Sequence, residues 1–190
     1  TKDTLENNNK WDSVEVVIPD FKAKLKIQGA YINGNRDGTW TEFFKNGKRK
    51  TELNYLNGKF NGLQSYWNEN GNKIEEKNYV NGKQEGLRTL FYNETRIKKE
   101  ETYYKDGVQT GLWTNWFPDG QKNKERYFSN GERDSIWTTW YKNGNKKLQA
   151  TYSNGKLNGK YTSWFDGGII KEKEGDYLNN KKHNKWTFWS

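Results

Sequence analysis

The aromatic residues of this chain recur with a long and regular period. Seven copies of one pattern follow each other at intervals of 24 or 25 residues, and two positions of the pattern hold a ring in every copy. The first column consists of Tyr31, Tyr55, Tyr79, Tyr104, Phe128, Tyr152 and Tyr177. The second column consists of Phe43, Trp67, Phe91, Trp116, Trp140, Trp164 and Trp189. Because short repeats bury their apolar surface against their neighbours, two unbroken columns predict a structural spine.

Glycine-containing turns separate the short runs of apolar and polar residues. Three columns of turn residues punctuate the pattern. The first holds Gly34, Gly58, Gly82, Gly107, Gly131, Gly155 and Asn180, and the second holds Gly38, Gly62, Gly86, Gly111, Ser135, Gly159 and Asn184. The third holds Gly47, Gly71, Thr95, Gly120, Gly144 and Gly168. Asn-Gly pairs predict hairpin turns, because both residues tolerate a positive φ.

The spacing of the turns predicts strands of five to seven residues, such as Thr39–Phe44 and Arg49–Tyr55. We expect Asn46-Gly47 to turn a hairpin and the segment 57–62 to join it to the next one. No stretch shows the 3.6-residue period of an amphipathic helix. Since a lone hairpin is marginally stable, the sequence predicts an all-β fold, an elongated solenoid-type array of antiparallel β-hairpins. Residues 28–190 would hold about seven repeats.

The residues before the repeats follow another pattern. Residues 1–12 are polar and predict a tether, whereas residues 13–27 include the strand-like segments Val14–Ile18 and Phe21–Ile27 and predict capping strands. The chain lacks cysteine and does not begin with Met. We interpret this start as a processed N-terminus, which favours a cell-envelope, periplasmic or secreted protein and leaves a cytoplasmic one open.

The composition favours a folded chain with an aromatic core. Only 31% of the residues are hydrophobic, a fraction that by itself favours disorder, but 16% are aromatic. Each buried aromatic ring removes roughly 150–250 Å² from water. A few rings in each repeat can therefore replace the missing aliphatic residues.

A third aromatic column is less regular. It holds Trp40, Trp113, Trp137, Tyr161 and Trp186, and in two repeats Gln64 and Arg88 take its place. Trp40 and Phe43 are three residues apart, so in a regular strand their side chains face opposite sides of the sheet. Since the column is interrupted, we take it as the candidate surface for a binding partner, with packing as the alternative role.

The sequence contains no obvious catalytic set. An acid or amide precedes each Tyr31-type residue by three positions, at Gln28, Glu52, Glu76, Glu101, Glu125, Gln149 and Glu174. A residue repeated seven times predicts a structural role, either a cross-strand pair with a lysine or a bond to a turn. The only histidine, His183, lies in a lysine-rich turn. We therefore predict a non-enzymatic protein without catalytic residues, metal ligands or cofactors.

The net charge of +9 suggests what the chain could bind. Basic clusters such as Lys48 to Lys50 and Lys122 to Arg126 follow the predicted hairpin turns, and acidic residues follow them closely. Lysines also protect strand edges against aggregation. A basic stripe could alternatively meet an acidic protein or an anionic membrane surface, with nucleic acid the least favoured partner.

The pattern Tyr-x-x-Gly-x-x-x-Gly, continued by Gly-x-Trp-x-x-Trp/Phe-aromatic-x-Asn-Gly, resembles the bacterial variant of the MORN repeat. The stretches Gly111–Gly120 and Gly159–Gly168 carry it most clearly, and Gln64, Arg88 and Thr95 depart from it. The resemblance implies an array of β-hairpins that contacts proteins or membranes and has no active site. It also implies kinship with antitoxin- or immunity-like proteins and with envelope lipoproteins.

Together these observations predict a protein-binding or scaffold repeat protein, and the resemblance implies that it is immunity- or antitoxin-like. One alternative is a cell-envelope protein that binds carbohydrate on Trp and Tyr side chains. The other is association with an anionic membrane surface through the basic stripe.

Overall fold

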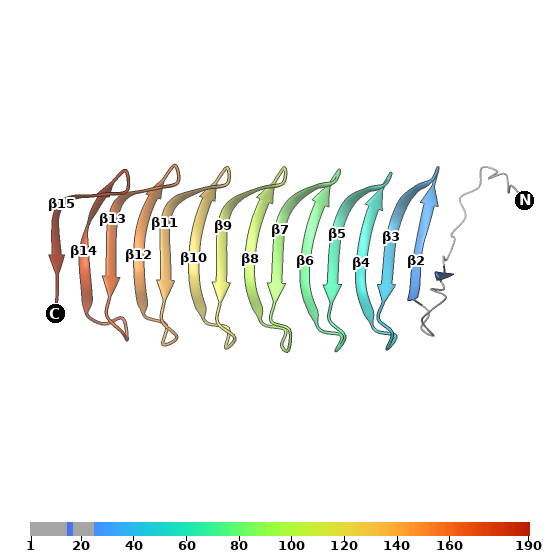
Figure 1. Cartoon of the computed structure of the whole chain (residues 1–190), viewed down its shortest axis with the longest axis horizontal. Coiled ribbons are helices and arrows are strands. Elements are labelled where there is room, and N and C mark those ends of the chain that lie inside the picture. Colours follow the sequence, from blue (N-terminus) through green and yellow to red (C-terminus); the bar gives the residue numbers. More distant parts are fainter. Residues whose placement is uncertain (1–14, 17–24) are drawn as a thin grey trace, which may run out of the picture. The chain divides into compact units, whose positions relative to one another are not determined.

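A computed structural model describes residues 15–16 and 25–190, and the side chains from residue 29 onward. The described part of the chain contains β-strands and turns and no helix. It divides into two compact units, residues 1–83 and 84–190. In each unit the strands lie side by side in sequence order (Figure 1). The predicted all-β array of antiparallel hairpin repeats is thereby confirmed.

The first unit contains six strands: β1 (Glu15–Val16), β2 (Leu25–Ile32), β3 (Asn35–Phe43), β4 (Arg49–Leu56), β5 (Lys59–Trp67) and β6 (Lys73–Val80). The second unit contains β7 (Lys83–Phe91, of which Lys83 precedes the division), β8 (Lys98–Lys105), β9 (Val108–Trp116), β10 (Lys122–Ser129), β11 (Glu132–Trp140), β12 (Lys146–Ser153), β13 (Lys156–Trp164), β14 (Lys171–Leu178) and β15 (Lys181–Phe188). The predicted tether lies outside the described residues, as do most of the capping segments, so both remain predictions.

Two kinds of turn alternate along each unit. Asn57 and Gly58 have φ values of 49° and 78° and form a two-residue turn between β4 and β5. The second kind is longer. In it the amide of Phe44 donates to the carbonyl of Lys48, and Gly47 has a φ of 82°. Both kinds reverse the chain into a hairpin, so each unit is a continuous antiparallel meander.

The strands are longer than the sequence suggested. The segment 57–62 was expected to be a connection, but the turn ends at Gly58 and Gly62 lies inside β5. There the register shifts between the pairs Leu53–Gln64 and Tyr55–Phe60, so a β-bulge opposes Asn54. Gly62 has a φ of 94°, and an added Cβ would lie 3.5 Å from the Cβ of Asn54. The glycine therefore serves a bulge, and the strand continues through it.

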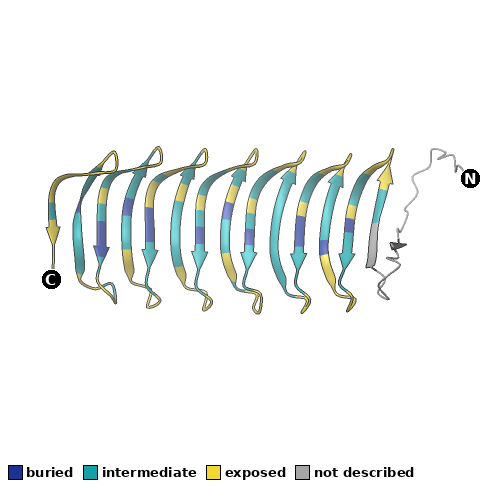
Figure 2. Cartoon of the chain, in the orientation of Figure 1, coloured by how far each residue is buried: buried dark blue, intermediate teal, exposed yellow. Residues whose placement is uncertain are grey.

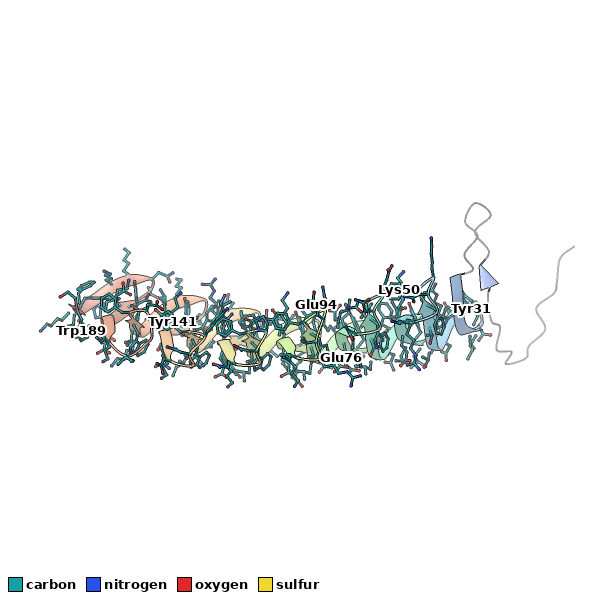
Figure 3. All side chains as sticks on the ribbon, turned by 90° about the horizontal axis from the view of Figure 1, so that it is seen from below. Tyr31, Lys50, Glu76, Glu94, Tyr141 and Trp189 are labelled. Atoms are coloured by element: carbon teal, nitrogen blue, oxygen red, sulfur yellow. The ribbon has the colours of Figure 1, made fainter. Side chains whose placement is uncertain are left out.

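The sheet of each unit is one layer of strands with side chains on both surfaces (Figure 3). We call the surface that carries the Trp40 and Tyr31 columns the aromatic face. The opposite surface, the threonine face, carries the Glu52-type and Phe43-type columns and the threonines and serines paired with the glutamates. Buried positions are confined to the middle of the strands, and the turns are exposed (Figure 2). Among the described residues, the buried apolar side chains are those of Trp40, Trp137 and Ala150.

Candidate binding surfaces

The Trp40-type side chains cover the bulges of the aromatic face. The indole nitrogen of Trp40 donates to the carbonyl of Ala30 at 3.2 Å, and that of Trp137 donates to the carbonyl of Tyr127 at 3.0 Å. Trp186 makes the same bond to Asp176 at 3.2 Å. Each acceptor immediately precedes a Tyr31-type residue and adjoins a register shift of the ladder. The ring thus provides a donor for a carbonyl beside an interruption of the regular ladder.

Gln64 replaces the tryptophan and retains its interaction. Its amide nitrogen donates to the carbonyl of Asn54 at 3.0 Å, and its amide oxygen accepts from the amide of Asn54 at 3.0 Å. The side chain is completely buried, with 0% exposure. A residue that interrupts the aromatic pattern in the sequence therefore preserves its hydrogen bond in the structure.

Small residues make room for these rings on the preceding strand. A Cβ added to Gly29 would collide with the indole of Trp40, and one added to Gly175 would collide with the indole of Trp186. Ala150 pairs with Tyr161 across β12 and β13 and is 1% exposed. The ring and the small residue thus form a complementary pair.

This packing limits the Trp40 column as a contact surface. Trp40 is 4% exposed and Trp137 is 7% exposed, whereas Trp113, Tyr161 and Trp186 are half-buried. A partner at this face would therefore touch mainly the three half-buried rings, and their part in binding remains a prediction. Trp189 is the one described tryptophan that is more than about a third exposed, at 37%. A row of open tryptophan platforms for sugar rings is thus not observed among the described residues.

The Tyr31 column packs against the Trp40 column. The ring of Trp137 lies 5.3 Å from that of Phe128 and 4.6 Å from that of Tyr152. Tyr177 stands edge-on to Trp186 with ring centres 5.1 Å apart. In the second unit, the hydroxyls of Tyr92 and Tyr141 donate to the carbonyls of the next Phe43-type residues, Trp116 and Trp164, at 2.7 and 2.9 Å. Rings and tyrosine hydroxyls thus connect successive repeats on the aromatic face.

The repeated glutamates bind lysines of their own strand. Lys122 donates to Glu125 at 2.6 Å and Lys171 to Glu174 at 2.7 Å, in each case across three residues. A cross-strand pair was one expected arrangement, and Lys160 makes it with Glu174 at 3.5 Å. Residues three apart reach the same side here because the register shifts between them, as it does between Lys122 and Lys124. The basic clusters after the turns are therefore partly neutralised.

Glu174 shows the electrostatic effect of this arrangement. The hydrogen bond from Lys171 lowers the pKa of Glu174, burial opposes it, and the hydroxyl of Thr162 at 3.2 Å lowers it further. The lysines also lie near the Phe43-type rings of the threonine face, with Lys171 5.6 Å from the ring centre of Trp189. These contacts account for the recurring Lys, Glu and Trp positions as structural features.

An exposed apolar strip lies on the threonine face of the second unit. We define the apolar strip as Leu87, Tyr103, Leu112, Tyr127 and Ile136, which are 42–55% exposed. Leu87 pairs with Tyr103, and Leu112 pairs with Tyr127. Ile136 lies in the bulge of β11 beside the pair of Tyr127 and Asp134. Five large apolar side chains are thus aligned across neighbouring strands and remain open to solvent.

The apolar strip was not predicted from the sequence. A signal was present in the residue that follows the second glycine column: Thr39, Leu63, Leu87, Leu112, Ile136, Lys160 and Lys185. This position is apolar in four consecutive repeats and polar in the other three, so the fold does not require it to be apolar. Only the strand pairing showed that tyrosines of the neighbouring strands extend the same row.

The described part of the chain contains no group of three or more His, Cys, Asp or Glu side chains placed to hold a metal ion. None of its elements is a helix of the length and apolarity needed to cross a membrane.

Single-layer sheets of regularly repeated hairpins, with interactions mainly between adjacent strands, define the class of β-hairpin repeat proteins. Four segments, residues 36–57, 60–81, 109–130 and 133–154, match the family model of the MORN repeat variant. The chain is a MORN-repeat protein, and such proteins generally serve in binding or as scaffolds. A comparison with curated proteins gives no significant match.

Proposed function

We propose that this chain is a non-catalytic protein-binding repeat protein that holds a partner protein against the threonine face of its second unit. The observation that carries the proposal is the apolar strip. Contiguous exposed apolar side chains on a soluble protein commonly mark interaction sites. The ion pairs of Lys98 with Glu101 and of Lys122 with Glu125 lie on the same face and would supply a polar rim.

The distribution of apolar residues supports a role in binding. Thr39 and Lys160 occupy the equivalent position in other repeats without interrupting the strand, so Leu87, Leu112 and Ile136 are not needed to form the sheet. The particular form that we propose is an immunity- or antitoxin-like protein, with a toxin as its partner. The resemblance to the bacterial repeat variant supports that form.

The test compares two triple variants with the unchanged protein. The first variant combines Leu87→Thr, Leu112→Thr and Ile136→Thr. Threonine is the residue that the first repeat has at the equivalent position, Thr39. The control, Ile169→Thr with Ile170→Thr and Leu178→Thr, removes three apolar side chains outside the strip that are exposed at least as much as Leu87. Each protein is used for affinity capture from an extract of the source organism, and the dissociation constant of any captured protein is then measured.

We expect one protein to be retained by the unchanged chain and by the control, with affinity about tenfold or more weaker for the strip variant. Equal retention by all three proteins would place the contact elsewhere. Binding only to a glycan array or to anionic vesicles, with no protein retained, would support the carbohydrate or membrane alternative instead. Circular dichroism establishes that each variant keeps its β-structure.

A further inference from the structure

A guanidinium lies between two indole rings on the aromatic face of the second unit. The Cζ atom of Arg126 is 4.7 Å from the ring centre of Trp113 and 4.7 Å from that of Trp137. Arg126 pairs directly with Trp113, and on its other side it opposes the bulge that contains Trp137. Both indole rings therefore lie within cation–π distance of the same guanidinium.

A second arginine adjoins this arrangement. The Cζ atom of Arg133 lies 4.8 Å from the ring centre of Trp137 and 5.6 Å from that of Tyr152. Two arginines thus share the ring of Trp137. Burial, and after it the charge of Arg133, lower the pKa of Arg126. Electrostatic interactions with Tyr152 and Glu100 oppose this lowering and are weaker.

Neither arginine makes a hydrogen bond or an ion pair within the described part of the chain, and Glu100 is the acid that acts electrostatically on Arg126. Three other arginines, Arg36, Arg49 and Arg88, have partners. Arg36, which occupies the position of Arg133 in the first repeat, donates to the hydroxyl of Tyr55 at 3.1 Å. Arg88 lies 3.7 Å from Glu100. The donors of Arg126 and Arg133 are therefore available to a ligand.

The geometry restricts what this ligand can be. The N–H donors of Arg126 lie in the plane of its guanidinium, and the edge of a guanidinium matches a carboxylate in a bidentate arrangement. The aromatic surroundings suit the apolar stem of an acidic side chain. Glu100 on β8 and Glu172 on β14, the latter bound to Ser163 at 2.7 Å, lie on the same face at either side of the arginines. These acids would repel a polyanion that extends along the sheet.

We propose that Arg126 and Arg133 form a binding site for a carboxylate of an acidic peptide segment in a partner protein. The site lies on the aromatic face, whereas the apolar strip lies on the threonine face. The arginine site does not depend on the apolar strip. The experiment on one surface can therefore contradict its proposal while the experiment on the other supports its own.

The experiment titrates the full chain with a short peptide of alternating Glu and Gly and follows the indole N–H signals by NMR. The signals of Trp113 and Trp137 should shift, while those of Trp164 and Trp189, which belong to the opposite face of the second unit, should serve as internal references. A peptide with Gln in place of Glu should cause no shift. Inorganic phosphate, a ten-residue oligothymidylate and phosphatidylserine vesicles are titrated in parallel.

The variant Arg126→Thr with Arg133→Gln places at each position a residue that other repeats contain there, as at Thr102 and Gln109. The control, Lys105→Ser with Lys142→Gln, removes the same two charges elsewhere in the unit. We expect the affinity for the Glu peptide to fall about tenfold or more in the arginine variant, because charge-assisted hydrogen bonds are lost, and less than about twofold in the control. Arg126→Lys keeps the positive charge but lacks the two parallel N–H donors of a guanidinium, so it should also weaken binding.

Equal losses in the arginine variant and the control would show that net charge alone attracts the peptide and would overturn the proposal. Tighter binding of phosphate, oligothymidylate or vesicles than of the peptide would overturn it as well, as would a titration in which the signals of Trp113 and Trp137 do not move. Because the shifts are measured on the unchanged protein, the proposal remains testable even if the double variant does not fold.

Discussion

The third aromatic column shows how one residue can combine packing with hydrogen bonding. The indoles of Trp40 and Trp186 each cover a glycine of the preceding strand, and the indole of Trp137 lies beside Arg126. All three indoles donate to a carbonyl beside a bulge. Gln64 keeps only the hydrogen bond. In these four repeats the side chain therefore supplies a donor for that carbonyl, and the ring is an additional contribution.

Replacing Trp137 by Phe separates these two contributions. Phe keeps an aromatic ring but leaves the carbonyl of Tyr127 without its donor, so we expect the free energy of unfolding to fall by about 1–3 kcal/mol. Urea denaturation followed by circular dichroism measures the change. Trp116→Phe is the matched control, because Phe43 and Phe91 occupy that column naturally, and it should cost less than about 1 kcal/mol. Equal costs would argue against a role for the indole donor.

The loss of folding stability at acidic pH should depend partly on Glu174. Its pKa in the folded state lies below the usual 4.5, so its stabilising contribution is present above that pH and is lost as the pH falls through the lowered pKa. Lys171→Gln should raise this pKa by removing the principal hydrogen bond. Carbon-detected NMR of the glutamate carboxyl groups measures it, with Lys156→Gln as a control on the neighbouring strand. An unchanged pKa in Lys171→Gln would mean that the hydrogen bond from Lys171 does not cause the shift.

At the scale of the elements, bulges decide which side chains share a face. Within each unit, the pairs of strands that join successive repeats shift register near a Tyr31-type residue, and the hairpins shift again near a Phe43-type residue. The second shift brings Lys171 and Glu174 to the same side of β14 although they are three residues apart. It also explains why the repeated glutamates bind lysines of their own strand.

The pairing between strands β14 and β15 allows a direct test of ring complementarity. Gly175→Ala should lower the free energy of unfolding by about 1–3 kcal/mol, because the new methyl group collides with the ring of Trp186. Adding Trp186→Tyr should recover part of this loss, since Ala150 and Tyr161 form that pair naturally. The double-mutant cycle measures the coupling between the two positions. Strictly additive effects would indicate that the ring adjusts without strain.

At the scale of the molecule, the chain consists of two compact units whose strands contact mainly their sequence neighbours. In this arrangement stability is a sum of local terms between adjacent strands. The two proposed binding surfaces lie on opposite faces of the second unit. A single-layer sheet can thus carry an apolar surface on one face and a cationic site on the other.

Local stability predicts a local response to substitution. In Gly175→Ala, amide hydrogen exchange should accelerate in β12 to β15, near the altered position. The amides of β3 to β5 should keep their protection. Hydrogen-exchange mass spectrometry resolves the two regions by peptide, with the unchanged protein as reference. Uniform acceleration along the chain would instead mean that both units unfold together.

The sequence by itself determined the repeat, the all-β class and the turns. These features depend on local requirements, since only glycine and a few other residues, such as Asn179 and Asn180, accept the positive φ values of the turns. The regular spacing of rings then implied that neighbouring repeats pack together. Strand lengths were underestimated because Gly62 was interpreted as a turn residue, and a bulge uses the same backbone conformation.

Only the tertiary structure decided which side chains are available. The alternation of side chains gives two faces, but it does not show that Trp40 is covered by its own strands while Leu112 is open. Tyr103 and Leu87 are sixteen residues apart and become neighbours through the register of β7 and β8. In the same way, Trp113, Arg126 and Trp137 come together from three strands. Register and bulges are set by pairing between strands, and exposure follows from them.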